Sequence, residues 1–174
     1  MTSKQTTSKH AAVVGAGIMG RLLAWRLCRS GWRVSLYDTH AQDDQSSCSF
    51  AAAGMLSPFA EVETALHGIV AIGLASLPLW QSIWQTLPGA YARSLSGSLL
   101  LGHTQDASEL KRFLGVLQQR FQGVDSEHAP FTALSSKGLE RLEPALGGFS
   151  GQAVFFPQEG YVDPEGVMQA LAQA

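Results

Sequence analysis

The chain has 174 residues, of which 45% are hydrophobic, so it is long enough to bury the core of one domain or slightly more. A formal net charge of -2 and a pI near 6.2 exclude the broad basic surface that a nucleic-acid partner requires. The first ten residues are polar, and the apolar stretch over 11–17 is too short to span a bilayer. We therefore expect a globular cytoplasmic protein with a small-molecule substrate and no membrane partner.

Metal and disulfide chemistry have little support in this sequence. Its two cysteines, Cys28 and Cys48, form neither a paired framework nor a Cys-x-x-Cys motif, and we expect both to be free structural thiols. His67 and His103 have no Cys, Asp or second His at ligand spacing. We predict no metal site.

The first part of the chain has the pattern of a βαβ unit. A short apolar run over 11–14 ends in glycine and predicts a buried strand. Apolar residues at helical spacing follow from Ile18, and Gly31 stands where a glycine commonly ends a helix. Alternating apolar residues over 32–37 predict a second strand. We predict one βαβ unit over residues 11–38.

A G-x-G-x-x-G motif lies between the first predicted strand and its helix, which is the context that dinucleotide binding requires. Gly15 permits a tight turn, Gly17 lets the backbone approach a pyrophosphate, and Gly20 lets the helix pack closely on the strand. The helix N-terminus attracts the anion. Asp38 ends the second strand and is suited to bind a ribose hydroxyl, which disfavours NADP. Thr39 either adds a hydroxyl to this site or serves only as a turn residue.

Residue patterns predict further helices and strands in the rest of the chain. In chain order they are a helix over 61–87 kinked by Pro78, a strand over 98–101, a helix over 107–121 capped by Asp106, a helix over 135–142, a strand over 152–156, and a final helix capped by Asp163 with Pro164 in its first turn. An open parallel sheet normally needs more strands than the two of the βαβ unit. We therefore expect an incomplete fragment.

The choice between NAD and FAD depends on the next segment, Ser46-Ser47-Cys48-Ser49-Phe50-Ala51-Ala52-Ala53-Gly54-Met55-Leu56. Both NAD and FAD present a ribose and a pyrophosphate, so the glycine motif alone does not separate them. Small residues over 51–54 let a backbone approach something flat or bulky. From the residues alone, tight helix packing is the simpler interpretation of the same stretch.

Three motifs, GAGIMG, the acid of SLYD and SFAAAGMLSP, resemble the glycine oxidase branch of the FAD-dependent D-amino-acid oxidase family, whose glycine oxidases serve thiamine biosynthesis. Softer similarities follow in the same order, namely Gly-Ser-Leu-Leu-Leu over 97–101, Leu-Glu-Pro over 142–144 and Gly-Tyr-Val-Asp-Pro over 160–164. The resemblance spans nearly the whole chain and corresponds to the N-terminal part of the family.

The resemblance implies FAD as the cofactor and assigns its contacts residue by residue. The implied contacts are Gly15, Gly17, Ile18, Met19 and Gly20 at the pyrophosphate, Asp38 and Thr39 at the adenosine ribose, Cys48 and Ser49 near the phosphates, and Ala53, Gly54 and Met55 beside the flavin ring. Cys48 departs from the hydroxyl residue that is usual in the family, and a thiol is a weak donor. The family's substrate-binding arginine belongs to its C-terminal half, so the resemblance assigns no catalytic residue to this chain.

The resemblance also implies an activity. It implies that the amine carbon of glycine or a related amino acid is oxidised by hydride transfer to the flavin, with oxygen as the acceptor. Two alternatives stay open: an FAD-binding module or inactive fragment without turnover, and a flavoprotein domain acting on aminomethyl groups of modified tRNA. An NAD-dependent dehydrogenase is disfavoured by the AAAGML segment.

The expected fold class is α/β, with a Rossmann-like FAD-binding βαβ domain and an inserted α+β portion of a substrate domain. Four regions are predicted: a polar tail over 1–10, the FAD-binding βαβ unit with its flavin-facing segment over 11–60, a partial substrate or cap region over 61–156, and a return to the FAD domain through a truncated helix over 157–174.

Overall fold

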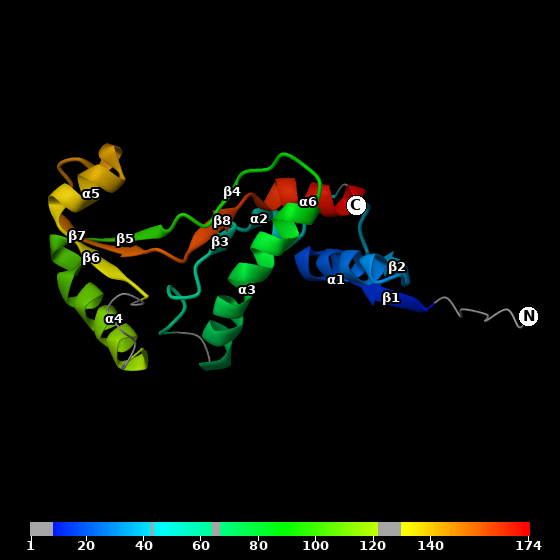
Figure 1. The fold of residues 1–174 in the computed structure, drawn as a ribbon, viewed down its shortest axis with the longest axis horizontal. Helices are drawn as coiled ribbons and strands as arrows, with labels where there is room; N and C mark the ends of the chain where they lie inside the picture. The colour runs from blue at the N-terminus through cyan, green and yellow to red at the C-terminus, as the bar shows by residue number, and fades with distance from the viewer. Residues whose placement is uncertain (1–8, 43, 64–66, 122–129) are drawn as a thin grey trace, which may run out of the picture. The chain divides into compact units, whose positions relative to one another are not determined.

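A computed structural model describes residues 9–42, 44–63, 67–121 and 130–174 of the chain. The chain divides into two compact units (Figure 1). Unit 1 comprises Met1–Gly54, Ile83–Ala92 and Val162–Ala174, and unit 2 comprises Met55–Ser82 and Arg93–Tyr161. The functional roles expected for the four sequence regions stay predictions.

Unit 1 contains the predicted βαβ unit. Strand β1 (His10–Val14) leads into helix α1 (Ile18–Arg29), which is followed by strand β2 (Arg33–Tyr37). The two strands are parallel and pair along their whole length. Gly31 follows the helix with a φ of 80°, and its amide donates to the carbonyl of Cys28 at 3.0 Å. The glycine therefore ends the helix as the sequence predicts.

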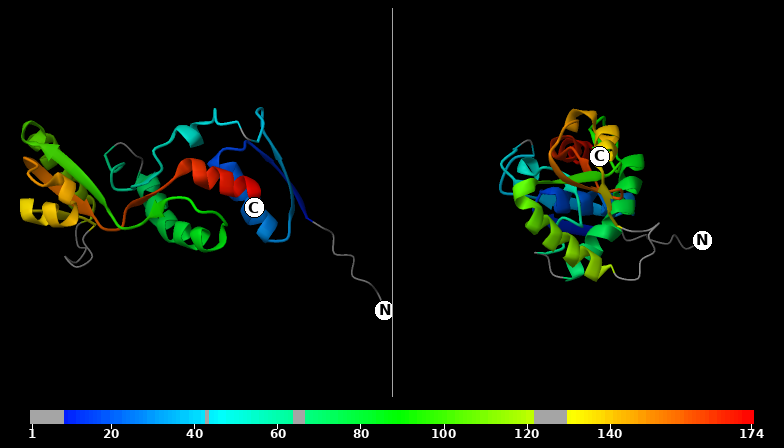
Figure 2. Two further views of the ribbon diagram at one scale, coloured as in Figure 1. Left: turned by 90° about the horizontal axis from the view of Figure 1, so that it is seen from above. Right: turned by 90° about the vertical axis from the view of Figure 1, so that its left-hand side faces the viewer.

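Two further helices lie wholly in unit 1. The short α2 (Cys48–Ala51) and the later α6 (Pro164–Gln173) contact each other, and α1 packs against α6 (Figure 2). The start of α6 matches the prediction, because the carboxylate of Asp163 accepts a hydrogen bond from the amide of Gly166 at 3.2 Å. Pro164 occupies the first turn, where its missing N–H costs nothing.

Unit 2 contains two sheets of short strands. One sheet has the order β3-β8-β4, formed by Met55–Leu56, Gly160–Val162 and Arg93–Ser94, with the last residue of β8 counted in unit 1. The other has the order β5-β7-β6, formed by Ser98–His103, Gly151–Phe156 and Thr132–Leu134. Both neighbours of β7 run antiparallel to it, and Ser98 lies opposite Phe156. The predicted strands over 98–101 and 152–156 are therefore present and slightly longer than expected.

The long predicted helix starts later than the sequence indicated. Helix α3 spans His67–Thr86 with Pro78 inside it, whereas residues 61–63 form a turn and 64–66 lie outside the described residues. The amide of Val62 bonds to the carbonyl of Phe59 at 3.2 Å, and both side chains are fully buried. A tight turn thus buries these two apolar residues just before the helix that the sequence pattern placed over this stretch.

Two helices that lie wholly in unit 2 are near their predicted positions. Helix α4 (Ala107–Arg120) follows a 3-10 turn, and α5 (Ser136–Leu142) is capped by the Ser135 hydroxyl. Asp106 occupies the N-cap position of α4 but makes no side-chain cap hydrogen bond, which corrects the predicted cap. The reason is conformational: Asp106 has φ -97° and ψ 7° at the end of the 3-10 turn and lacks the extended backbone that a capping residue uses.

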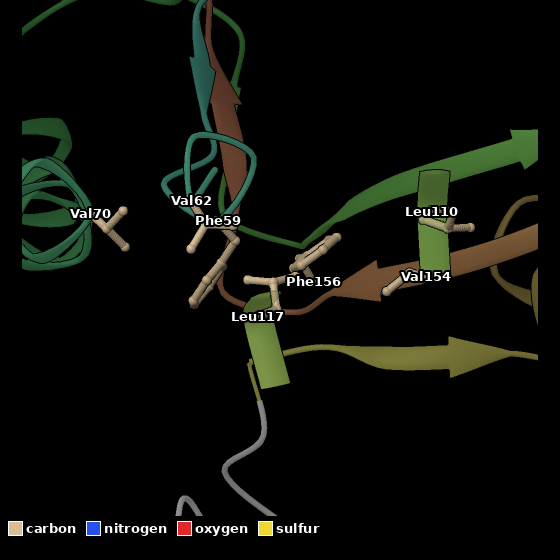
Figure 3. Packing of buried hydrophobic residues seen from close by; sticks show 7 residues of the cluster. All are labelled: Phe59, Val62, Val70, Leu110, Leu117, Val154 and Phe156. Atoms are coloured by element: carbon tan, nitrogen blue, oxygen red, sulfur yellow. The ribbon is translucent and has the colours of Figure 1, made fainter. Parts of the chain in front are cut away.

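The core of unit 2 is aromatic at its centre. Its buried members come from a turn, two helices and one strand, as Figure 3 shows: Phe59, Val62, Val70, Leu110, Leu117, Val154 and Phe156. The rings of Phe59 and Phe156 stack with centroids 5.8 Å apart, and Phe121 meets Phe59 edge-on at 5.4 Å. Such contacts add to the hydrophobic stabilisation from burial. This cluster holds α4 on the β5-β7-β6 sheet.

Candidate cofactor site

The glycine motif of unit 1 forms a tight turn between β1 and α1. Gly15 has a φ of 99°, which favours glycine, and its amide donates to the carbonyl of Tyr37 at 2.7 Å. A Cβ at Gly20 would overlap the carbonyl oxygen of Gly15. The first and third glycines are therefore needed for the turn itself and for the close approach of α1.

The start of α1 has backbone amides without an intrahelical partner, and that of Ile18 donates to the Ser49 hydroxyl. The first bond of the helix runs from the amide of Arg21 to the carbonyl of Gly17 at 3.0 Å, so the amides of Ile18, Met19 and Gly20 precede the intrahelical ladder. The Met19 side chain is 77% exposed. Amides at the positive end of a helix dipole form an anion site, which fits the phosphates of a dinucleotide.

Ser49 and Cys48 start helix α2 next to the glycine turn. The Ser49 hydroxyl accepts a hydrogen bond from the amide of Ile18 at 3.0 Å, and a Cβ on Gly17 would lie 3.2 Å from it. Ser49 is therefore placed against the backbone that joins the glycine turn to α1. Cys48 is a free, exposed thiol, and Cys28 is also exposed, which corrects the expectation of structural thiols.

Asp38 lies at the end of β2 and contacts the glycine turn directly. Its Oδ2 accepts from the amide of Ala16 at 2.6 Å, and its Oδ1 accepts from the amide of His40 at 3.1 Å. These bonds, that from Ala16 above all, lower the pKa of the carboxyl to about 2. The Thr39 hydroxyl lies 3.4 Å from Oδ1 and 3.0 Å from Nδ1 of His40. The charged carboxylate has further lone pairs that could accept ribose hydroxyls.

A pocket of about 260 Å³ opens beside this carboxylate. Ala16, Asp38 and His40 line it together with Arg21, Leu36, Gln42, Leu171 and Ala172. Sites that enclose a whole drug-sized ligand have volumes of roughly 300–1,000 Å³. The pocket is therefore too small for a whole dinucleotide and suits one end of it.

The segment Ala53-Gly54 is fixed by its backbone. Gly54 has a φ of 70°, its carbonyl accepts from the amide of Val162 at 2.8 Å, and a Cβ there would overlap the Val162 carbonyl oxygen. Ala53 is exposed. Tight packing thus explains Gly54 by itself, and its role beside a flavin stays a prediction.

Met55 belongs to unit 2, unlike the rest of the predicted cofactor contacts. It pairs with Tyr161 across β3 and β8, is 61% exposed, and lines a pocket of about 420 Å³ that also includes Glu159. The structure therefore brings the glycine motif, Asp38, Thr39, Cys48 and Ser49 together within unit 1, whereas Met55 lies in the other unit.

Arg21 is a feature of this site that the motifs of the sequence did not indicate. It is only 5% exposed, and its guanidinium donates to the carbonyls of Ala16, Gln42 and Met168 at 2.6, 2.9 and 3.1 Å. A signal was available in the sequence, because Arg21 lies one helical turn before the buried Trp25. A charged residue on the apolar face of a helix needs partners in the folded protein.

Glu159 is the second buried charged residue that sequence reasoning missed, and it lies in unit 2. It is 1% exposed, accepts from the amide of Phe59 at 2.8 Å and receives the Ser98 hydroxyl at 2.5 Å. Burial raises the pKa of this carboxyl, while the hydrogen bonds oppose the rise. Its sequence context, Pro-Gln-Glu-Gly, is that of a turn and gives no sign of burial.

No helix in the described part of the chain is long and apolar enough to cross a membrane. The described residues also contain no group of three or more His, Cys, Asp or Glu side chains that could hold a metal ion.

The turn, the helix N-terminus and Asp38 define a dinucleotide-binding α/β protein. Residues 10–174 match the model of the family described as FAD dependent oxidoreductase, and the chain belongs to this family. FAD is the cofactor of the family, as the resemblance in the sequence implied.

The chain is also similar to two named proteins. The chain is 33% identical over 160 residues to a protein named putative thiamine biosynthesis oxidoreductase ThiO from Rhizobium etli, covering 92% of this chain and 44% of that protein. It is 31% identical over 172 residues to a tRNA 5-methylaminomethyl-2-thiouridine biosynthesis bifunctional protein MnmC from Ralstonia nicotianae, covering 95% of this chain and 24% of the other.

The fold is similar to that of glycine oxidase from Geobacillus kaustophilus, with a TM-score of 0.75 at 25% identity over 92% of this chain and 42% of that structure. This similarity confirms the predicted α/β class. The chain thus spans less than half the length of the relatives that it matches.

Proposed function

We propose that unit 1 binds FAD with its pyrophosphate at the glycine turn and its adenosine ribose at Asp38. The observation that carries this proposal is the amide of Ala16 bound to the Asp38 carboxylate, which joins the two parts of the site. The amides at the start of α1 would face the phosphates, and Ser49 would border them. Thr39 and Cys48 are proposed to lie at the edges of the same surface.

We further propose that the parent enzyme oxidises the amine carbon of glycine or a related small amino acid. The similarity to glycine oxidase and to the ThiO protein supports this substrate class. Bound FAD would supply the chemistry by accepting a hydride from that carbon, with oxygen as the final acceptor. Within this chain, the roles would be to hold and orient the cofactor, with Ala53, Gly54 and Met55 proposed beside its ring.

An aminomethyl group on modified tRNA is the competing substrate, supported by the relatives named MnmC. These relatives are less similar to the chain than the ThiO protein, and the chain covers only about a quarter of their length. The net charge of -2 also provides no general attraction for a polynucleotide. We therefore favour the amino-acid substrate.

Anaerobic reduction of the bound cofactor tests the proposed activity. The full-length parent enzyme loaded with FAD is mixed with glycine, sarcosine or a 5-methylaminomethyl uridine nucleoside, and the visible absorbance of the flavin is followed. Bleaching by glycine or sarcosine is the expected result. Bleaching by the nucleoside alone would favour the competing substrate, and bound FAD that no amine bleaches would contradict the proposed oxidase activity.

A further inference from the structure

We propose that Arg21 is a positioning residue that holds the glycine turn in the conformation that binds a diphosphate. This inference rests on the proposed binding of FAD to unit 1. It concerns a side chain outside the G-x-G-x-x-G motif, whose role in the site follows from its contacts.

Two oppositely charged side chains bind the backbone N–H and carbonyl oxygen of Ala16, the residue between the first two glycines. Its N–H donates to the Asp38 carboxylate at 2.6 Å, and its carbonyl accepts from Nε of Arg21 at 2.6 Å. Hydrogen bonds to charged groups are roughly twice as strong as neutral ones. The orientation of both peptide groups of Ala16 is therefore fixed before any ligand binds.

The guanidinium is itself held from several directions. Its two terminal nitrogens donate to the carbonyls of Met168 in α6 and Gln42 in the loop after β2, at 3.1 and 2.9 Å. Its Cζ lies 5.9 Å from the centre of the Phe50 ring in α2. One side chain thus connects the glycine turn to three other segments of unit 1, a task that suits the planar fork of arginine and not the single ammonium of lysine.

Arg21 also lies close to where the ligand is proposed to bind. It lines the 260 Å³ pocket together with Ala16 and Asp38. Its buried guanidinium binds the carbonyl oxygen of Ala16, so that this oxygen is held by a positive charge and is not left free beside an anion. Without the guanidinium, the Ala16 carbonyl would be free to rotate toward the phosphates and repel them.

The inference predicts a ligand-specific effect. Removing Arg21 should weaken ligands that carry a diphosphate much more than adenosine, which contacts only the ribose and base end of the site. A purely structural role would lower the stability of the apoprotein and weaken both kinds of ligand by the same factor. The ratio of ADP affinity to adenosine affinity therefore separates the two explanations.

Calorimetric titration of Arg21→Met with ADP and adenosine measures this ratio. We expect ADP affinity to fall by about tenfold or more, as for loss of hydrogen bonds to a charged group, and adenosine affinity to fall by a clearly smaller factor, because Arg21 also lines the pocket at the ribose end. Arg26→Met is the matched control, because Arg26 is an exposed arginine of the same helix. It should bind both ligands like the wild type.

The relative losses of ADP and adenosine affinity decide whether Arg21 positions the glycine turn. Equal losses for ADP and adenosine, or no loss for either, would overturn the inference. If Arg21→Met does not fold, Arg21→Lys replaces it, and a selective loss of ADP affinity is again expected because the three donors of lysine share one nitrogen and cannot reach the carbonyls that three separate guanidinium nitrogens bind. Unchanged ADP binding by the lysine variant would overturn the inference alone, whereas a wild-type chain that binds neither ADP nor FAD would overturn the proposed function as well.

Discussion

Each unit of this protein contains one buried charged residue among those that the structure describes, and the two are stabilised differently. In unit 1 the Arg21 guanidinium donates to three backbone carbonyls around the glycine turn. In unit 2 the Glu159 carboxylate accepts from a backbone amide and a serine hydroxyl beside an aromatic cluster. Unit 1 thus keeps its backbone groups ordered and accessible to a ligand, whereas unit 2 draws its stability from packed side chains.

The largest effect should come from the aromatic core of unit 2. Replacing Phe59 with alanine removes a side chain that is 1% exposed and should lower the free energy of unfolding by about 3–5 kcal/mol. Ile72, which is 71% exposed in α3, is the control, and Ile72→Ala should change stability by no more than about 0.5 kcal/mol. Urea unfolding measures both, and similar losses for the two variants would show that the core assignment is wrong.

The glycine turn should be the most sensitive position for ligand binding. A Cβ at Gly20 would overlap the Gly15 carbonyl, so Gly20→Ala must displace the turn, and FAD affinity should fall on the order of 100-fold, near the upper end of overpacking costs. Gly115 in α4 is the control, because a methyl group there would meet no atom within 4 Å outside its own helix backbone. Gly115→Ala should stabilise the protein by about 1 kcal/mol and leave FAD affinity unchanged. Equal FAD affinities for the two variants would contradict the role of the turn.

Asp38 should contribute less to FAD affinity than the turn does. Asp38→Asn keeps the shape of the side chain but removes its charge, so we expect FAD affinity to fall by about tenfold. Flavin fluorescence quenching measures the change.

The lowered pKa of Asp38 adds a stability contribution that is present above its ordinary pKa of 3.8 and is lost as the pH falls toward 2. Urea unfolding at successive pH values tests this contribution. If the free energy of unfolding of Asp38→Asn fell below pH 3.8 as steeply as that of the wild type, Asp38 would not be its source.

Glu159 should have a pH dependence of opposite sign. Because burial raises its pKa above the ordinary 4.5, the folded protein holds this proton more tightly than the unfolded chain. The free energy of unfolding should therefore decrease as the pH rises from 4.5 through the raised pKa. Glu159→Gln should flatten this part of the profile in urea titrations at successive pH values, and an unchanged slope would assign the dependence to other groups.

The sequence alone predicted local features that depend only on the type of a residue and its position in a turn or at a helix end. Gly15, Gly20 and Gly31 were predicted because only glycine fits their turns, and the Asp163 cap followed from residue type and position. Arg21 and Glu159 could not be predicted in the same way. Their partners lie up to 147 residues away in the sequence, so their roles appear only when distant segments are brought together.

Titration of the 174-residue chain with FAD, in the absence and presence of ADP and riboflavin, tests the central claim most directly. The proposed site recognises the diphosphate and the adenosine ribose, so FAD should bind, ADP should compete with it, and riboflavin should not. Absence of FAD binding, or competition by riboflavin without competition by ADP, would contradict the assignment of the glycine turn and Asp38 as the cofactor site.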